Sequence, residues 1–180
     1  MHVHGCRLSF GELAETKLEK HMRNLLSARR CAHNVTEFLG CRTAGSALRR
    51  RLGLGRRKDF RGCYVFLHGD KPVYVGVSKN VIKRICQHVS GTEHNSATFV
   101  YKMTAAVVKL KKSTGNKKKP TRAAAMVRRR FRRVFGEKQA RLLDMRVAYI
   151  PIENHLELYL FEAYAAMKLG TGHWNTFATH

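Results

Sequence analysis

Two short apolar runs on either side of a turn constrain the fold of this chain more than any other feature of its sequence. The runs are Cys63–Leu67 and Pro72–Val77, and the segment between them, His68–Lys71, has Gly69 and Asp70 at its centre. Runs of this length around such a pair are typical of a β-hairpin. We therefore expect two antiparallel strands between residues 63 and 77.

Helical patterns lie on both sides of this hairpin. Ser9 and Glu12 have the spacing of a capping box at the start of a helix over residues 9 to 30, and its apolar stripe would contain Leu18, Met22, Leu25 and Leu26. Weaker helical segments follow at about 35–39 and 44–52. After the hairpin we expect a helix capped by Asn80, a helix over 96–110, a basic helix over 121–135, a strand over 145–150 and a helix over 154–168.

This order of elements predicts an α+β fold. A small antiparallel or mixed three-stranded sheet would be flanked by helices in the order β-β-α-α-β-α, with an N-terminal helical extension. Gly53 and Gly55 interrupt the pattern before the hairpin. We therefore predict a basic helical extension over residues 1–58, followed by a domain over 59–180 with a basic insertion at about 109–135.

The charge of the chain indicates a polyanionic partner. Lys and Arg number 35 against 12 Asp and Glu, a formal net charge of +23. Such a field makes nucleic acid the first candidate, although a ribosomal-type protein or a membrane-surface binder has the same signature. No acidic residue lies between His94 and Gly136. The basic residues that we expect to bind nucleic acid there are Lys111, Lys112, Lys117, Lys118, Lys119, Arg128, Arg129, Arg130, Arg132 and Arg133.

The apolar and cysteine patterns set the expected environment. The N-terminus has no apolar core of signal-peptide length, and no run of eighteen apolar residues occurs, so we expect a soluble intracellular protein, cytoplasmic or nucleoid-associated, without membrane contact. The five cysteines are widely spaced and include no C-x-x-C pair, so a disulfide framework is not expected. Zinc-ligand residue types occur at His2, His4, Cys6, Cys31, His33 and Cys41. Their spacing is not that of a finger or ribbon, so we prefer reduced thiols and surface histidines to a zinc-stabilised module.

Tyr64 and Tyr74 are candidates for a shared site in the hairpin. If its loop has an odd number of residues centred on Gly69, the two tyrosines lie opposite each other and both rings leave the same face of the sheet. An even loop would put the rings on opposite faces. Two tyrosines in neighbouring strands are also commonly a packing feature.

Three further side chains are candidates for phosphate and metal chemistry. Arg84 and His88 are four residues apart and so share one helix face, where an arginine fork could bind phosphate and a histidine could pass a proton. The alternative is a solvated helix face. Glu162 interrupts a helix that is otherwise apolar on every side, so its carboxylate needs a cation or a salt bridge with an arginine. Mg²⁺, or Mn²⁺, is the natural cation beside phosphates because it takes oxygen ligands.

Taken in order, these residues resemble the GIY-YIG nuclease superfamily. The pattern consists of Gly62-Cys63-Tyr64, Tyr74-Val75-Gly76-Val77-Ser78, Arg84, Gln87-His88, Glu162 and Asn175. The resemblance covers residues 62 to 177 and leaves 1–58 uncovered. Cys63 replaces the usual branched residue of the first motif, and Val75 replaces the isoleucine of the second; neither position supplies chemistry in the family. The insertion after His88 is longer and more basic than in compact members.

The resemblance implies a metal-dependent endonuclease that hydrolyses phosphodiester bonds, in DNA more than in RNA. Tyr64 would activate or position the water, with Tyr74 in the same cluster; Arg84 would bind the phosphate, Glu162 would hold the metal ion, and Asn175 would orient site groups. His88 is a further candidate for proton transfer. The rival interpretation is a non-catalytic basic protein that keeps the nuclease fold as a clamp. Cutting both strands of a duplex would favour a homodimer or two successive nicks.

Overall fold

The hairpin forms where the two apolar runs predict it. In the computed structural model, which describes residues 6–39, 49, 53–54, 58–92, 97–108 and 120–177, β2 (Gly62–His68) and β3 (Lys71–Ser78) pair antiparallel. Gly69 and Asp70 join them. Gly69 has a φ of 59°, a left-handed conformation that a residue without a Cβ adopts at little steric cost.

A third strand, β4 (Arg146–Pro151), pairs antiparallel with the other edge of β2, and the two-residue strand β1 (His33–Asn34) lies beyond it. The strand order is β1-β4-β2-β3, so β3 is an edge strand. The expected α+β fold with an antiparallel sheet is confirmed, and it has a short fourth strand that the sequence pattern did not indicate. Two residues are too few to show an alternation of apolar and polar positions.

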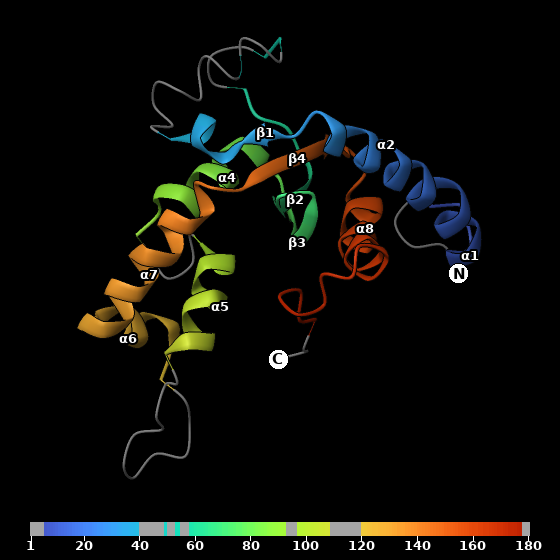
Figure 1. The fold of residues 1–180 in the computed structure, drawn as a ribbon. Coiled ribbons are helices and arrows are strands. Elements are labelled where there is room, and N and C mark those ends of the chain that lie inside the picture. Colours follow the sequence, from blue (N-terminus) through green and yellow to red (C-terminus); the bar gives the residue numbers. More distant parts are fainter. Residues whose placement is uncertain are drawn as a thin grey trace. The chain divides into compact units, whose positions relative to one another are not determined.

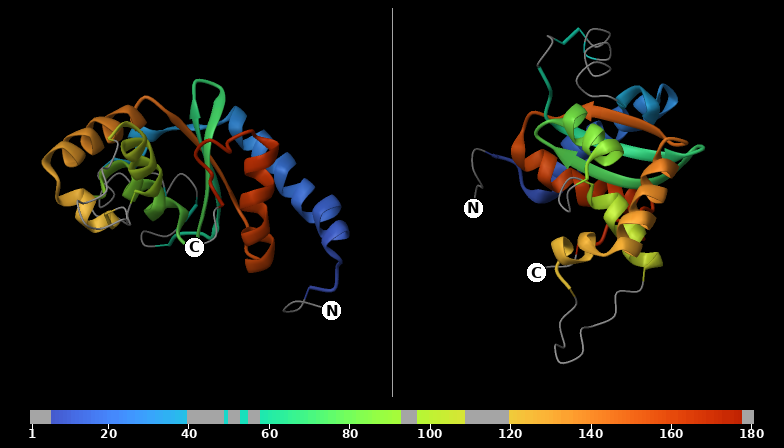
Figure 2. Two further views of the ribbon diagram at one scale, coloured as in Figure 1. Left: turned by 90° about the horizontal axis from the view of Figure 1, so that it is seen from below. Right: turned by 90° about the vertical axis from the view of Figure 1, so that its left-hand side faces the viewer.

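The described residues group into two units, of which the first contains the sheet. It consists of Met1–His33, Phe60–Val81 and Arg146–His180. Figure 1 shows its N-terminal helix beside α8 (His155–Lys168), and Figure 2 shows the two on the same face of the sheet. Their shared core includes Leu18, Met22 and Leu25 from the N-terminal helix, Cys63, Val65 and Leu67 from β2, and Leu158, Phe161 and Ala165 from α8.

The N-terminal helix consists of α1 (Phe10–Leu13), a π-helical turn η1 (Ala14–Leu18) and α2 (Glu19–Arg30). The predicted capping box is present: the Glu12 N–H donates to Ser9 Oγ at 3.3 Å, and the Ser9 N–H donates to Glu12 Oε2 at 2.7 Å. The wider π turn keeps Leu13 and Leu18, five residues apart, in the same core. Leu26, expected in the stripe, is 42% exposed because it lies about 100° round the helix from its buried neighbour.

The second unit consists of Asn34–Asp59 and Ile82–Met145. Its described elements are η2 (Val35–Phe38), most of α4 (Val81–Ser90), α5 (Thr98–Val107), α6 (Arg122–Val127) and α7 (Arg129–Leu142). α5 and α7 pack together, with the rings of Tyr101 and Phe131 5.1 Å apart. The guanidinium of Arg122 lies 5.2 Å from the centre of the Tyr101 ring, a cation–π geometry that joins α6 to this pair.

The basic helix expected over 121–135 is wrong in one respect, because it breaks at Arg128. This residue has φ −72° and ψ 123°, an extended conformation that ends α6 and begins α7. The Arg128 carbonyl accepts from the Arg132 N–H at 3.0 Å, so α7 begins directly at the break.

The described residues of the predicted extension over 1–58 are divided between the two units: those up to His33 belong to the unit that contains the sheet, and those from Asn34 on belong to the second unit. The domain boundary near residue 58 stays a prediction. The segment predicted as a helix over 44–52 lies almost wholly outside the described residues. Within the described part of the chain, no helix combines the length and the apolar character needed to cross a membrane.

Candidate active site

The rings of Tyr64 and Tyr74 leave the same face of the sheet, with their centres 6.5 Å apart. The register differs from the expected one: Tyr64 lies opposite Gly76, and Tyr74 lies opposite Phe66. The turn between the strands has an even number of residues, which alone would separate the rings. A β-bulge after Phe66 leaves Val73 as an extra residue and restores the common face.

Both glycines of the two tyrosine motifs are required by close approach. A Cβ on Gly76 would collide with the hydroxyl end of the Tyr64 ring, which extends over this glycine. A Cβ on Gly62 would collide with the backbone carbonyl of Ile150 in β4. Gly76 thus determines where the Tyr64 hydroxyl lies, and Gly62 lets β4 pair closely with the strand that carries Tyr64.

Asn175 binds the edge strand beside this pair. Its Oδ1 accepts from the Val75 N–H at 2.9 Å, and its Nδ2 donates to the Val75 carbonyl at 2.7 Å. Both bonds are buried, and Asn175 is 6% exposed. The amide therefore supplies the donor and the acceptor that a neighbouring strand would supply, and it fixes the backbone between Tyr74 and Gly76.

Glu162 lies on α8, whose start is capped by the Asn154 side chain through bonds from the Leu156 and Glu157 N–H groups. Its side chain is half-buried. Burial raises the pKa of the Cys63 thiol, and the nearby Glu162 carboxylate raises it further, so a negative group lies near Cys63, whose side chain leaves β2 on the face opposite to Tyr64. The expectation that this helix is mostly buried holds for only part of it, because Tyr159 and Met167 are 77% and 81% exposed.

Arg84 and His88 lie in the part of α4 that belongs to the second unit. One interpretation of the sequence was that Arg84 and His88 lie on a solvated helix face. This is wrong for His88, which is 1% exposed. Burial, together with the Arg84 charge, lowers its pKa from 6.5 to about 3, so the imidazole is neutral at physiological pH. The Gln139 side chain donates to the His88 carbonyl at 3.3 Å.

The start of α4 is capped by a residue that the sequence did not single out. Asp59 accepts from the Ile82 N–H at 3.0 Å and from the Lys83 N–H at 2.9 Å, in place of the expected Asn80 side chain. A cap normally comes from the residue just before the helix, so a carboxylate 23 positions earlier gives no local signal. Asp59 therefore orients the helix that carries Arg84.

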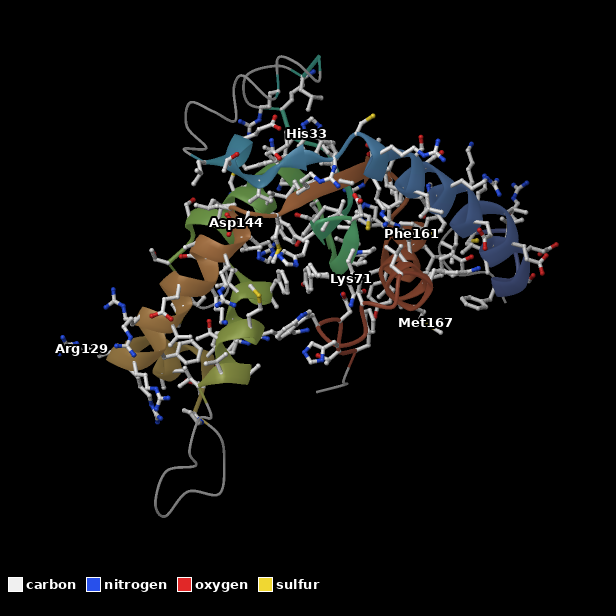
Figure 3. The ribbon with its side chains drawn as sticks, viewed as in Figure 1. His33, Lys71, Arg129, Asp144, Phe161 and Met167 are labelled. Carbon is white, nitrogen blue, oxygen red and sulfur yellow. The ribbon has the colours of Figure 1, made fainter. Side chains whose placement is uncertain are left out.

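The predicted nucleic-acid contacts lie on two segments. Lys111, Lys112, Lys117, Lys118 and Lys119 lie outside the described residues. The arginines of the other segment surround the α6–α7 break and are exposed: Arg128, Arg129, Arg130, Arg132 and Arg133. Figure 3 shows Arg129 projecting from the start of α7. Arg133 is 3.7 Å from Glu137, an exposed pair that neutralises little of this charge.

The donor set suits a divalent ion that needs few protein ligands. Among the described residues, no three His, Cys, Asp or Glu side chains gather as a metal site would require. Mg²⁺ is commonly held by one or two carboxylates together with waters and substrate phosphate, which fits Glu162 alone. Of the residues in the zinc alternative, Cys6 and Cys31 form no disulfide, while His2, His4 and Cys41 lie outside the described residues.

One expectation about the cysteines is wrong. Cys86 in α4 is disulfide-bonded, whereas a sequence with five widely spaced cysteines gave no sign of a disulfide. Spacing along the chain does not reveal which side chains a fold brings together. Cys63, the residue before Tyr64, is a buried free thiol, and its burial in the core supports a packing role for that position.

Comparison with known proteins adds one positive finding. No curated protein and no solved structure matches the chain. The family model of the GIY-YIG catalytic domain matches residues 60–119, a segment that contains both tyrosine strands and the helix with Arg84 and His88. Over this segment, one third of its length, the chain is similar to the catalytic domain of the GIY-YIG nucleases.

Proposed function

We propose that this protein is a divalent-metal-dependent endonuclease that hydrolyses phosphodiester bonds, with DNA placed ahead of RNA by family resemblance. The observation that carries the proposal is the arrangement of the hairpin. The Tyr64 ring lies over Gly76, and the Tyr74 ring leaves the same face of the sheet. Asn175 binds the backbone of Val75, the residue between Tyr74 and Gly76. An arrangement that uses two glycines and a buried amide to place two tyrosines is more specific than ordinary packing requires.

The proposed roles follow from what each group can supply. Hydrolysis needs an activated water, a group to offset charge on the phosphoryl oxygens and a stabilised leaving oxygen. Tyr64 activates or positions the water, with Tyr74 hydrogen-bonding in the same cluster. Arg84 binds the scissile phosphate through its planar fork of donors.

Glu162 holds the metal ion in this proposal. A bound Mg²⁺ or Mn²⁺ supplies Lewis acidity at the leaving oxygen. The half-buried carboxylate beside β2 supports this role, because a carboxylate removed from water favours a cation as its partner. Asn175 contributes by fixing the Val75 backbone, which positions Tyr74.

Two groups compete for the role of general base. An unperturbed tyrosine has a pKa of about 10, so Tyr64 needs a cation nearby or a proton relay. His88 is already neutral at physiological pH and could accept a proton, but only by a path into its buried position. A His88→Gln variant separates the two: loss of the basic group should abolish turnover if His88 is the base and reduce it modestly if Tyr64 is.

The exposed arginines around Arg128 bind the phosphates of the substrate. Cations bound to phosphates release counterions from the nucleic acid, which supplies sequence-independent affinity. One site per chain would cut a duplex either as a homodimer or by two successive nicks.

Burial favours one rival function, a non-catalytic clamp with the same fold. Tyr64 is 2% exposed and Tyr74 is 7% exposed, so little of either ring meets solvent. A clamp would bind nucleic acid as tightly as the enzyme and would leave it intact.

Incubation with plasmid, single-stranded DNA and RNA, with Mg²⁺ or with chelator, tests the proposal. Cleavage should need the metal and disappear in Glu162→Gln, while Glu153→Gln, an exposed carboxylate near α8, should remain active. Binding without cleavage of any substrate by the unaltered protein would establish the clamp instead. Full activity of Glu162→Gln would exclude the proposed metal ligand.

A further inference from the structure

The N-terminal helix lies outside the segment that matches the family model, yet it packs along the helix that carries Glu162. Leu18, Met22 and Leu25 share a core with Phe161 and Ala165 of α8. Figure 3 shows Phe161 on the α2 side of α8 and Met167 away from it. The two helices therefore form one layer against the sheet.

Polar contacts join the same two helices. Glu19 Oε1 accepts from the Tyr164 hydroxyl at 2.5 Å and from Lys168 Nζ at 2.9 Å. Hydrogen bonds from Lys168 and Tyr164 lower the pKa of the Glu19 carboxyl, and the bond with Glu19 raises the pKa of Lys168, so both groups are charged at physiological pH.

A second polar contact lies closer to the start of α8. His21 Nε2 is 2.6 Å from Glu157 Oε2, and both side chains are 16% exposed. The His21 ring also meets the edge of Phe161, with centres 5.6 Å apart. Glu19 and His21 of α2 thus contact four residues of α8.

The four contacted residues of α8 lie on one side of the helix. Glu157, Phe161, Tyr164 and Lys168 recur every three or four residues and form one line along α8. Glu162 follows Phe161 directly and so points about 100° away from this line, towards β2. These α2 contacts lie on a different side of α8 from the carboxylate, and they fix the rotation and the axial position of the helix that carries it.

We propose that Glu19 and His21 are positioning residues for Glu162, so that the N-terminal helix is a working part of the nuclease. The proposal rests on the function proposed above, in which Glu162 holds the metal ion. Groups that hydrogen-bond a metal ligand change metal affinity or activity by roughly 10–100-fold when they are lost, and residues that act through the helix should give the lower end of that range. A rotation of α8 would displace Glu162 without unfolding the sheet.

The test is a charge exchange in the full chain. Glu19→Lys should lower kcat and raise the Mg²⁺ concentration for half-maximal activity, each by about tenfold. The double variant Glu19→Lys with Lys168→Glu restores an opposite-charge pair and should recover most of both losses. Glu15→Lys makes the same charge change on the exposed part of η1 and should behave as the unaltered protein does.

Two measurements separate the possible failures. Binding of Mn²⁺, followed by its paramagnetic resonance, should weaken in Glu19→Lys whether or not the protein cleaves nucleic acid, which keeps the positioning role testable if the proposed activity fails. Tyr164→Phe removes one hydroxyl, and it should shift the metal dependence in the same direction by a smaller factor even if Glu19→Lys does not fold. The inference would be overturned if the Glu19→Lys protein folds and keeps both its Mn²⁺ affinity and its kcat. If Glu19→Lys does not fold, the same result in Tyr164→Phe would overturn it.

Discussion

Asn175 uses one amide to satisfy both the N–H and the carbonyl of Val75, a residue 100 positions earlier in the chain. The bond pair occurs on the edge strand of the sheet, at the residue between Tyr74 and Gly76. A side chain thus completes the strand that carries half of the tyrosine pair.

Replacing Asn175 by Asp should therefore destabilise the protein. The carboxylate can still accept from the Val75 N–H, but it has no donor for the Val75 carbonyl and places charge against it. We expect a loss of about 1–3 kcal/mol in the free energy of unfolding, measured by urea denaturation, together with reduced cleavage. An unchanged denaturation midpoint would mean that the amide contributes nothing to this edge.

Gly76→Ala should disturb the site directly. The added Cβ overlaps the hydroxyl end of Tyr64, so the ring or the strand must move. Overpacking of this kind typically costs about 1–3 kcal/mol, and cleavage should fall further than stability explains. Gly136→Ala is the control, since its Cβ meets no atom within 4 Å and its position in α7 should make alanine stabilising. Equal activity of the two variants would contradict the proposed importance of the Tyr64 position.

His88 should make the folded state sensitive to acid. Its pKa is about 3 in the folded protein against 6.5 ordinarily, so below pH 6.5 the unfolded chain binds a proton that the folded chain does not. The stabilisation is fully present above pH 6.5 and is lost as the pH falls towards 3, by about 1.4 kcal/mol per pH unit. Unfolding measured between these values should show a shallower dependence in His88→Gln and an unaltered one in His68→Gln, an exposed control. Identical slopes for all three proteins would indicate that His88 is not held neutral.

The arginines around the α6–α7 break should set the salt dependence of binding. Arg129→Ala and Arg132→Ala should each reduce the slope of log affinity against log salt by about 0.9, the value for one phosphate contact on duplex DNA. Arg141→Ala, in the last turn of the same helix, should leave the slope unchanged. Fluorescence anisotropy with a labelled duplex at several salt concentrations provides the measurement. A slope that none of the variants changes would exclude this surface from binding.

Local sequence patterns predicted the parts of the fold that depend on neighbouring residues. The hairpin, the Ser9 capping box and the helix that begins after Asn154 all follow from residues within a few positions of one another. The common face of Tyr64 and Tyr74 could be given only conditionally, because it depends on a bulge as well as on the loop. No residue pattern in the strands indicates that bulge.

Local sequence patterns could not predict contacts between segments that are far apart in the chain. Asp59 at the start of α4 and Glu19 beside α8 are ordinary charged residues in the sequence, and only the fold supplies their partners. The resemblance predicted Asn175 as a site residue, but it did not predict that Asn175 binds Val75. The roles of Arg84, His88 and Glu162 in the reaction stay predictions.

The first unit takes its residues from both ends of the chain, and this has a consequence for the timing of folding. Its core needs Leu18 near the start and Phe161 near the end, and its edge needs Asn175. Contacts between such distant positions require large loops to close, which slows folding and makes it depend on late segments. During translation the hairpin would leave the ribosome long before α8 and Asn175 do. The nascent chain would therefore carry Tyr64 and Tyr74 without Glu162 or the strand partner, and the proposed nuclease activity would begin only after synthesis has passed residue 175.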